Sequence, residues 1–186
     1  MAEEDADAHY LLGRAYVQTG ELKKAAATFA QGVRVDPTFL EEHREEIAEA
    51  ADEFLAAGKE ALDAGDLATA TDLLTIVAPL VPGQGEVFVL LGQAHQRAND
   101  VGQALAAYAS AVNLEPGLAT EHADQINILA QKGLEMGQAA LESGDLATAA
   151  QIVGAVTVLL PDESKAHFLL GNIFNQANRF DQAIEQ

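Results

Sequence analysis

Apolar residues recur at helical spacing along most of the chain, and the pattern is clearest in two long segments. In residues 38–64, apolar side chains return every seven residues, at Leu40, Ile47, Phe54 and Ala61. In residues 118–143, one face is lined by Leu118, Ile126, Leu129, Gly133 and Met136. This spacing places the residues on one face of a helix. We therefore predict two long amphipathic helices, one over each segment.

The two segments belong to an internal repeat. Residues 61–70 read ALDAGDLATA and residues 140–149 read ALESGDLATA, so eight of ten letters match at an offset of 79 residues. The same offset relates His9 to Phe88 and His167, Gly13 to Gly92 and Gly171, Tyr16 to His95 and Phe174, and His43 to His122. Repetition over tens of residues is typical of a stacked array of structural units.

Turn and cap residues divide each 79-residue unit into two helical hairpins. One position of every hairpin holds glycine or asparagine, which best tolerate the left-handed conformation that closes a helix: Gly20, Gly65, Asn99, Gly144 and Asn178. Three of them are followed by an acid suited to begin the next helix: Asp66, Asp100 and Asp145. Prolines are predicted to end the second helices: Pro37, Pro82, Pro116 and Pro161.

Single glycines recur inside the first helix of each hairpin, at Gly13, Gly58, Gly92, Gly137 and Gly171. Glycine in a helix interior costs about 1 kcal/mol relative to alanine. A cost repeated in every hairpin indicates close approach of the partner helix. We expect the small residues on that helix to face the glycines, namely Ala25, Ala70, Ala104, Ala149 and Ala183.

These spacings resemble a known repeat. Leu12-Gly13, Tyr16, Gly20, Ala25, Phe29 and Pro37 follow the pattern of the tetratricopeptide repeat, a helix–turn–helix of about 34 residues, with His9 in place of its tryptophan. Similar units cover residues 6–39, 51–84, 85–118, 130–163 and, incompletely, 164–186. The resemblance implies a single array over residues 1–186. Its fold would be all-α, with five antiparallel helix pairs stacked as a right-handed α-solenoid built on a 79-residue double repeat.

Residues 40–50 and 119–129 depart from the family pattern as two insertions of eleven residues without Pro or Gly. Eleven residues make about three helical turns, so the apolar face stays in register. We expect each insertion to extend the first helix of repeats two and four at its start.

The chain is strongly acidic, with 29 acidic and 10 basic residues and a net charge of −19. This charge disfavours nucleic acid and anionic lipid, and favours a basic partner or reflects salt adaptation. Apolar runs such as residues 152–160 are too short to span a bilayer, and the acidic first residues do not form a signal peptide. There is no cysteine. We expect a cytoplasmic protein without membrane insertion, which can be a fragment of a longer one.

Catalytic sets are not evident. His9, His95 and His167 take positions that the family fills with core aromatics, and an adjacent Glu-His pair at His43 or His122 is poor ligand geometry. No phosphate-binding glycine loop or nucleophile elbow is present. We predict no catalytic, cofactor or metal site, and keep an enzyme or metal carrier as a remote alternative.

In the resemblance, the first helices line a groove that binds an extended or helical peptide. The groove positions are Tyr10, Arg14, Leu55, Lys59, Val89, Gln93, Gln96, Leu134, Gln138, Phe168 and Asn172. Apolar residues flanked by amides suit a peptide backbone; alternatively, the apolar row packs on neighbouring helices. We expect a protein–protein interaction scaffold. Some relatives bind a terminal carboxylate with lysine and asparagine at groove positions. Such a clamp is disfavoured here, because those positions hold Tyr10, Arg14, Glu86 and Leu90.

The rival interpretation is self-assembly into a homo-oligomer, through the long helices or through an open C-terminal end. At that end we expect Ile173, Phe174, Phe180 and Ile184 to be left partly uncovered.

Overall fold

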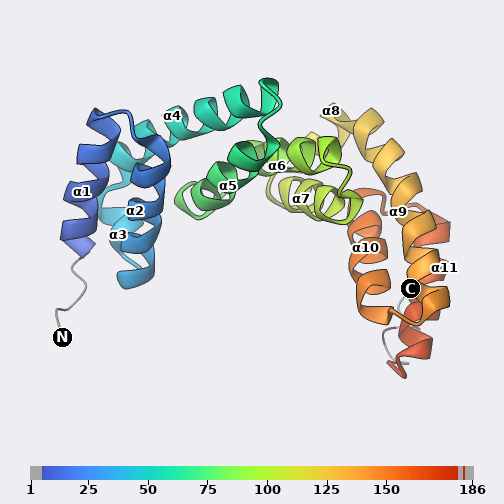
Figure 1. The fold of residues 1–186 in the computed structure, drawn as a ribbon. Coiled ribbons are helices and arrows are strands. Elements are labelled where there is room, and N and C mark those ends of the chain that lie inside the picture. Colours follow the sequence, from blue (N-terminus) through green and yellow to red (C-terminus); the bar gives the residue numbers. More distant parts are fainter. Residues whose placement is uncertain (1–5, 180–181, 183–186) are drawn as a thin grey trace. The chain divides into compact units, whose positions relative to one another are not determined.

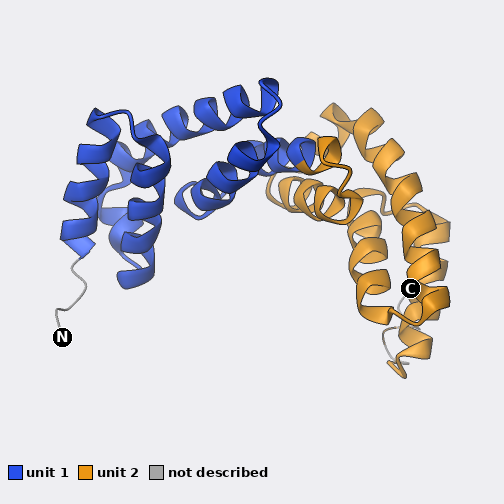
Figure 2. Cartoon of the chain, in the orientation of Figure 1, with its two compact units in different colours: residues 1–94 blue, residues 95–186 orange. Residues whose placement is uncertain are grey.

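A computed structural model describes residues 6–179 and residue 182, and every regular element within them is a helix (Figure 1). The chain divides into two compact units, residues 1–94 and residues 95–186 (Figure 2). Each unit is built of stacked helix pairs, so the predicted all-α solenoid class is confirmed. The single array over residues 1–186 stays a prediction.

The first unit contains two hairpins and the start of a third. Its elements are α1 (Ala6–Gln18), α2 (Leu22–Val35), α3 (Phe39–Glu42), α4 (Arg44–Asp63), α5 (Leu67–Val77), the 3₁₀-helix η1 (Ala78–Leu80) and α6 (Gly85–Arg97), whose last residues belong to the second unit. Helix α1 packs on α2 and α4 packs on α5, while α2 also contacts α4 and α5. The core is centred on the fully buried Phe29, Phe54 and Leu74.

The second unit repeats this arrangement. Its elements are α7 (Val101–Leu114), α8 (Leu118–Glu121), α9 (Ala123–Ser143), α10 (Leu146–Leu159) and α11 (Ser164–Gln176). Helix α10 packs against α7, α9 and α11, and the core holds Leu105, Tyr108 and Ile126. The second helix of the predicted fifth pair, with Phe180, Ala183 and Ile184, lies outside the described residues.

The turns between paired helices follow the sequence prediction. All five positions adopt left-handed backbone: Gly20 (φ 73°), Gly65 (80°), Asn99 (60°), Gly144 (83°) and Asn178 (57°). Asp66, Asp100 and Asp145 each accept a hydrogen bond at 3.1–3.2 Å from the backbone amide three residues ahead. Contacts with the Thr69 and Thr148 hydroxyl groups and backbone amides hold the pKa of Asp66 and Asp145 below its usual value. Asp66 and Asp145 therefore cap their helices in the ionised state.

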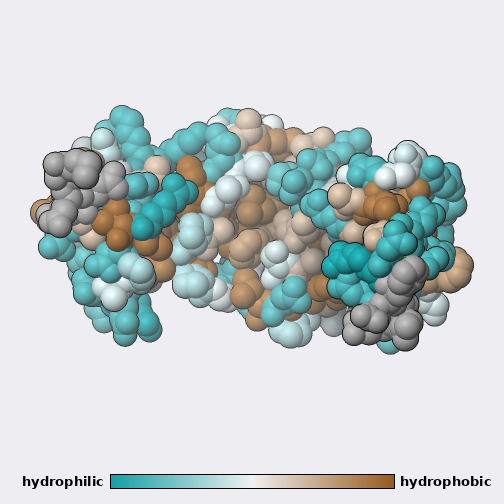
Figure 3. All heavy atoms as spheres, turned by 90° about the horizontal axis from the view of Figure 1, so that it is seen from below, coloured by the Kyte–Doolittle hydropathy of each residue, from teal (hydrophilic) through white to brown (hydrophobic). Residues whose placement is uncertain are grey.

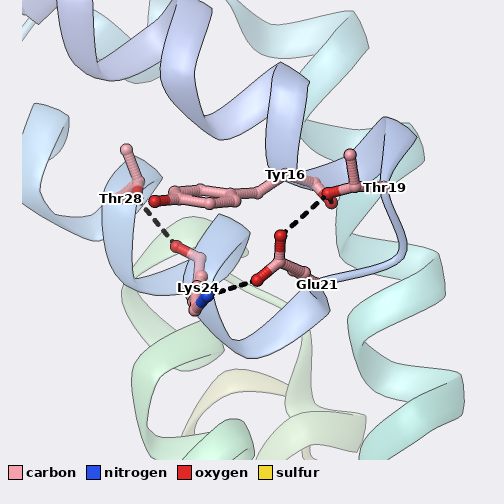
Figure 4. Close-up of polar contacts among 5 residues, drawn as sticks. All are labelled: Tyr16, Thr19, Glu21, Lys24 and Thr28. Carbon is pink, nitrogen blue, oxygen red and sulfur yellow. Dashed lines mark hydrogen bonds and ion pairs between the residues drawn. The ribbon is translucent and has the colours of Figure 1, made fainter.

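The first hairpin closes its turn differently, because Glu21 makes no capping bond to α2. Instead its carboxylate pairs with Lys24 one turn ahead and accepts a hydrogen bond at 3.3 Å from the Thr19 hydroxyl (Figure 4). The Lys24 ammonium also lies 5.5 Å from the centre of the Tyr16 ring. The hydrogen bond between Glu21 and Lys24 lowers the pKa of the acid and raises that of the lysine. This exposed cluster therefore takes the place of the aspartate cap.

Prolines end the second helices as expected, with one exception. Helices α2, α7 and α10 end two residues before Pro37, Pro116 and Pro161. In repeat two the prediction for Pro82 is wrong, because α5 already ends at Val77, two residues before Pro79. The chain continues as the single turn η1, which carries Pro79 near its start.

The eleven-residue insertions are helical but do not form one continuous helix with the segment that follows. The predicted helices over residues 38–64 and 118–143 are each interrupted at a histidine, His43 (φ −116°, ψ 27°) and His122 (φ −108°, ψ 23°). In the first unit the His43 ring stacks on Tyr10 of α1 at 3.8 Å between centroids. Phe39 covers Gly32 of α2, where a Cβ would lie 2.5 Å from the ring. These contacts favour the bend between α3 and α4.

The mid-helix glycines do mark close helix contacts, but alanine is not the nearest group. A Cβ at Gly13 would lie 2.5 Å from the Phe29 ring, and one at Gly58 would lie 2.8 Å from Leu74. At Gly137 the nearest atom is a methyl of Val153 at 2.4 Å. The facing residue is thus the large one four positions after the predicted alanine, which itself is buried in the same helix.

The two units fill one core position in opposite ways. Gly133 on α9 is covered by Leu105 of α7, since a Cβ there would lie 2.4 Å from the leucine Cδ1. At an offset of 79 residues, the first unit has Phe54 and Ala26, both fully buried. A large residue on one helix is therefore accompanied by a small one on its neighbour. Tyr108 replaces Phe29 in the same layer, and its buried hydroxyl has no hydrogen-bond partner among the described residues, so burial raises its pKa.

Two further expectations are wrong. Met136 is 43% exposed, because the inward row of α9 continues from Gly133 to Gly137, a helical turn along, and leaves Met136 at its edge. Ile173 is fully buried, because α11 packs against α10.

Candidate peptide-binding surface

In the second unit, the predicted groove positions other than Gln96 lie on α9 and α11, which contact each other. Phe168 on α11 is 71% exposed, the largest exposure of any bulky apolar residue described. Lys165, one turn before it, is also exposed, and Asn172, one turn after it, is half-buried. An aromatic ring left in water between a cation and an amide is a suitable anchor for a partner side chain.

Helix α9 contributes less than expected to this surface. Gln138 is exposed, and its side-chain nitrogen donates a 3.0 Å hydrogen bond to the Glu142 carboxylate on the same helix. Leu134 is buried. At this position the apolar row therefore packs inside the unit, which is the alternative stated for it above.

In the first unit, Tyr10 is engaged by its own protein. Its ring is stacked on His43, and its hydroxyl accepts a long hydrogen bond of 3.5 Å from the Arg14 guanidinium, which also lies 5.5 Å from the ring centre. Nearby, the pKa of Glu46 is lowered, mainly by its own backbone amide and further by the Tyr10 hydroxyl. Tyr10 thus fixes α1 against the start of α4. Only the part of its side chain that is not in contact with His43 and Arg14 is accessible to a ligand.

The remaining predicted positions divide between exposed and buried. Lys59 is exposed and Leu55 is half-buried on α4. On α6, Val89 is buried while Gln93 and Gln96 are half-buried. Figure 3 shows one face of the molecule, on which apolar residues form patches between hydrophilic ones.

The histidines do not assemble a site. Within the part of the chain that the structure describes, no three His, Asp or Glu side chains gather in a way that could hold a metal ion. The His167 ring lies with Nε2 2.8 Å from the Pro161 carbonyl oxygen, a contact that ties α11 to the preceding turn. The Nε2 atom of His43 is buried without a hydrogen bond in the described structure. The absence of a metal site stays a prediction.

Two segments match models of the tetratricopeptide repeat, residues 6–39 and residues 134–186. Together with the hairpins, their left-handed turns and their glycine contacts, these matches show that the chain contains tetratricopeptide repeats. Its repeats are those of a protein–protein interaction scaffold, and proteins of this family are generally not enzymes.

No curated protein matches the sequence. Among solved structures, two of the MamA protein are 17% identical, with a TM-score of 0.34; they cover 97% and 93% of this chain and 86% and 88% of theirs. YrrB, described as a tetratricopeptide repeat protein with an unusual peptide-binding site, is 19% identical with a TM-score of 0.34, over 99% of this chain and 84% of its own. These values are too low to transfer a property to this protein.

None of the described helices is both long and apolar enough to cross a membrane.

Proposed function

We propose that the protein binds a segment of a partner protein, without catalysis, on the first helices of the hairpins in its second unit, α9 and α11. The observation that carries this proposal is the exposed Phe168 ring between Lys165 and Asn172. An exposed aromatic ring beside polar groups can anchor a partner, because the ring offers a large apolar contact area. The net charge of −19 supports a partner segment that is basic.

The test replaces Phe168 with alanine and uses peptides selected from a phage-displayed library of random linear peptides on the unchanged protein. Loss of a central aromatic contact typically costs on the order of 2 kcal/mol, so affinity should fall by at least about tenfold. Fluorescence anisotropy of the labelled peptides measures the change.

The matched control is Val158→Ala, which removes an exposed apolar side chain from α10, a second helix. Its affinity for the same peptides should equal that of the unchanged protein. If Phe168→Ala binds the peptides as tightly as this control, the proposed surface is not the binding site.

Self-association is a second candidate, supported by the first helix. Leu11 and Leu12 of α1 are 64% and 47% exposed. Helices α6 and α11 occupy the place of α1 in the later copies of the 79-residue repeat. Their residues at the positions of Leu11 and Leu12 are all buried: Leu90, Leu91, Leu169 and Leu170. Helix α11 packs against α9 and α10 of the preceding hairpin, whereas the main neighbour of α1 among the described helices is α2.

If a second copy of the chain covers α1, the change Leu12→Glu should convert an oligomer into a monomer in sedimentation velocity experiments. Because Leu12 is exposed, the variant should keep its melting temperature. A monomer at every concentration of the unchanged protein would contradict this second candidate.

A further inference from the structure

The first unit contains a surface pocket of about 410 Å³ that includes none of the groove positions described above. We call it the extension pocket, because the inserted residues form one of its walls. It is lined by Pro37, Leu40, Glu41, Arg44, Ile47, Ala48, Leu80, Val81, Pro82 and Gln84. The volume lies within the range of roughly 300–1,000 Å³ that is usual for ligand pockets.

The pocket has an apolar floor and a polar rim. Ile47, Leu80 and Val81 are buried and form the floor. Glu41 and Arg44 are exposed on one side, and Gln84 is exposed on the other. This combination suits a ligand with one large apolar side chain and polar groups around it.

Both walls are held in place by contacts outside the pocket. On one side, Phe39 is seated over Gly32 and His43 is stacked on Tyr10, which together fix α3 and the start of α4. On the other side, η1 follows α5 directly, and the chain then turns through Gly83 with φ 98°. The pocket is therefore preformed, which lowers the entropic cost of binding.

A comparison with the second copy of the 79-residue repeat indicates which pocket residues the fold requires. The positions of the floor residues Ile47, Leu80 and Val81 are again apolar in the second copy, where they hold Ile126, Leu159 and Leu160. The rim is not, since the positions of Glu41, Arg44, Ala48 and Gln84 are taken by Thr120, Ala123, Asn127 and Glu163. The charged rim of the first unit is thus not needed to build the hairpin.

The charged residues around the extension pocket indicate the charge of the ligand that it binds. Five glutamates of the insertion, all exposed, surround the single cation Arg44: Glu41, Glu42, Glu45, Glu46 and Glu49. An acidic ligand would be repelled by this surface, whereas a cationic one would be attracted and steered to it. Glu41, at the rim, is placed to receive the first positive charge.

We infer that the extension pocket takes a large apolar side chain from a basic segment of a partner protein, with lysines or arginines on either side of it paired to Glu41 and Glu45. The apolar side chain covers Ile47, Leu80 and Val81. Arg44 and Gln84 donate hydrogen bonds to carbonyl oxygens of the bound segment. The inference does not depend on Phe168, which lies in the other unit, so each can fail while the other holds.

The experiment uses a synthetic peptide with one phenylalanine flanked on both sides by lysines, acetylated and amidated at its ends. Two comparison peptides carry alanine in place of phenylalanine or glutamates in place of the lysines. Fluorescence anisotropy should show binding of the first peptide at least about tenfold tighter than that of either comparison peptide. In amide NMR spectra, the shifts should centre on Ile47, Leu80 and Val81.

Two variants test the location. Ala48→Phe fills the mouth of the pocket from an exposed position, and the pair Glu41→Lys with Glu45→Lys reverses the rim charge. Each should weaken the lysine-flanked peptide by at least about tenfold. The matched control Asn127→Phe makes the same change at the equivalent exposed position of the second unit and should leave affinity unchanged.

Three outcomes would overturn the inference. Equal binding of the glutamate-flanked peptide would show that the acidic rim does not select a basic segment, and tighter binding would show that Arg44 selects an acidic one. Unchanged affinity in Ala48→Phe, with a circular dichroism spectrum equal to that of the unchanged protein, would place the peptide elsewhere. If Ala48→Phe dissociates an oligomer of the unchanged chain in sedimentation velocity, the occupant is a second copy.

Discussion

Replacing Gly133 with phenylalanine should unfold the second unit at temperatures where the unchanged protein is folded, and adding Leu105→Ala should reverse most of that loss. A Cβ at Gly133 would already lie 2.4 Å from the Leu105 side chain and 3.3 Å from Val156. A whole ring cannot be placed there without displacing α7 from α9. Overpacking of this kind typically costs about 1–3 kcal/mol or more.

The reversal is expected because the first unit already has phenylalanine and alanine at the two equivalent positions. It has Phe54 and Ala26 at the corresponding positions, in a core of similar apolar residues. Leu105→Ala alone should cost about 2–5 kcal/mol, since it leaves a cavity above Gly133. Urea unfolding followed by far-ultraviolet circular dichroism measures all four chains of this cycle. If the double variant is as unstable as the sum of the single ones, the two positions do not compensate each other.

Gly137→Leu and Gly154→Ala should change stability in opposite directions, although both replace glycine inside a helix. Gly137 faces a Val153 methyl at 2.4 Å, so a larger side chain must push α9 and α10 apart, at a cost of about 2–3 kcal/mol. Gly154 has nothing within 4 Å of its Cβ position, so alanine should stabilise α10 by about 0.5–1 kcal/mol.

Thermal melts of the two variants and the unchanged protein decide this prediction. Because both changes lie in the same helix pair, they report on the same folding unit. A lower melting temperature for Gly154→Ala would mean that its surroundings are more crowded than the structure indicates. No loss in Gly137→Leu would mean that α9 and α10 can separate freely.

The sequence predicted the hairpins well because their signals are local. A left-handed turn excludes most side chains, so glycine or asparagine at Gly65 or Asn99 is readable without any knowledge of tertiary contacts. An aspartate that caps the next helix is equally local. Pro79 was missed because Pro82 matched the repeat pattern, although a proline three residues earlier stops the helix first.

The errors concern contacts across helices, which periodicity does not define. The insertion was expected to continue the helix without interruption, but the chain bends at His43 and at His122. The contact beside the first bend, the stack of His43 on Tyr10, joins residues 33 positions apart in the sequence. The exposed Phe168 and the buried Leu134 hold the same kind of groove position, so their difference depends on how far each first helix is covered by its neighbours. The extension pocket is formed jointly by two loops and the start of a helix, and no sequence motif predicts it.

The opposed filling of the core by Phe54 with Ala26 and by Gly133 with Leu105 limits how the gene can be recombined. A crossover that joins the short hairpin of one copy to the long hairpin of the other would set phenylalanine against leucine, or glycine against alanine. The first chimera is overfilled and the second contains a void. Crossovers that transfer both hairpins together keep each matched pair, so at this position a gain or loss of 79 residues should be less destabilising than a gain or loss of one hairpin.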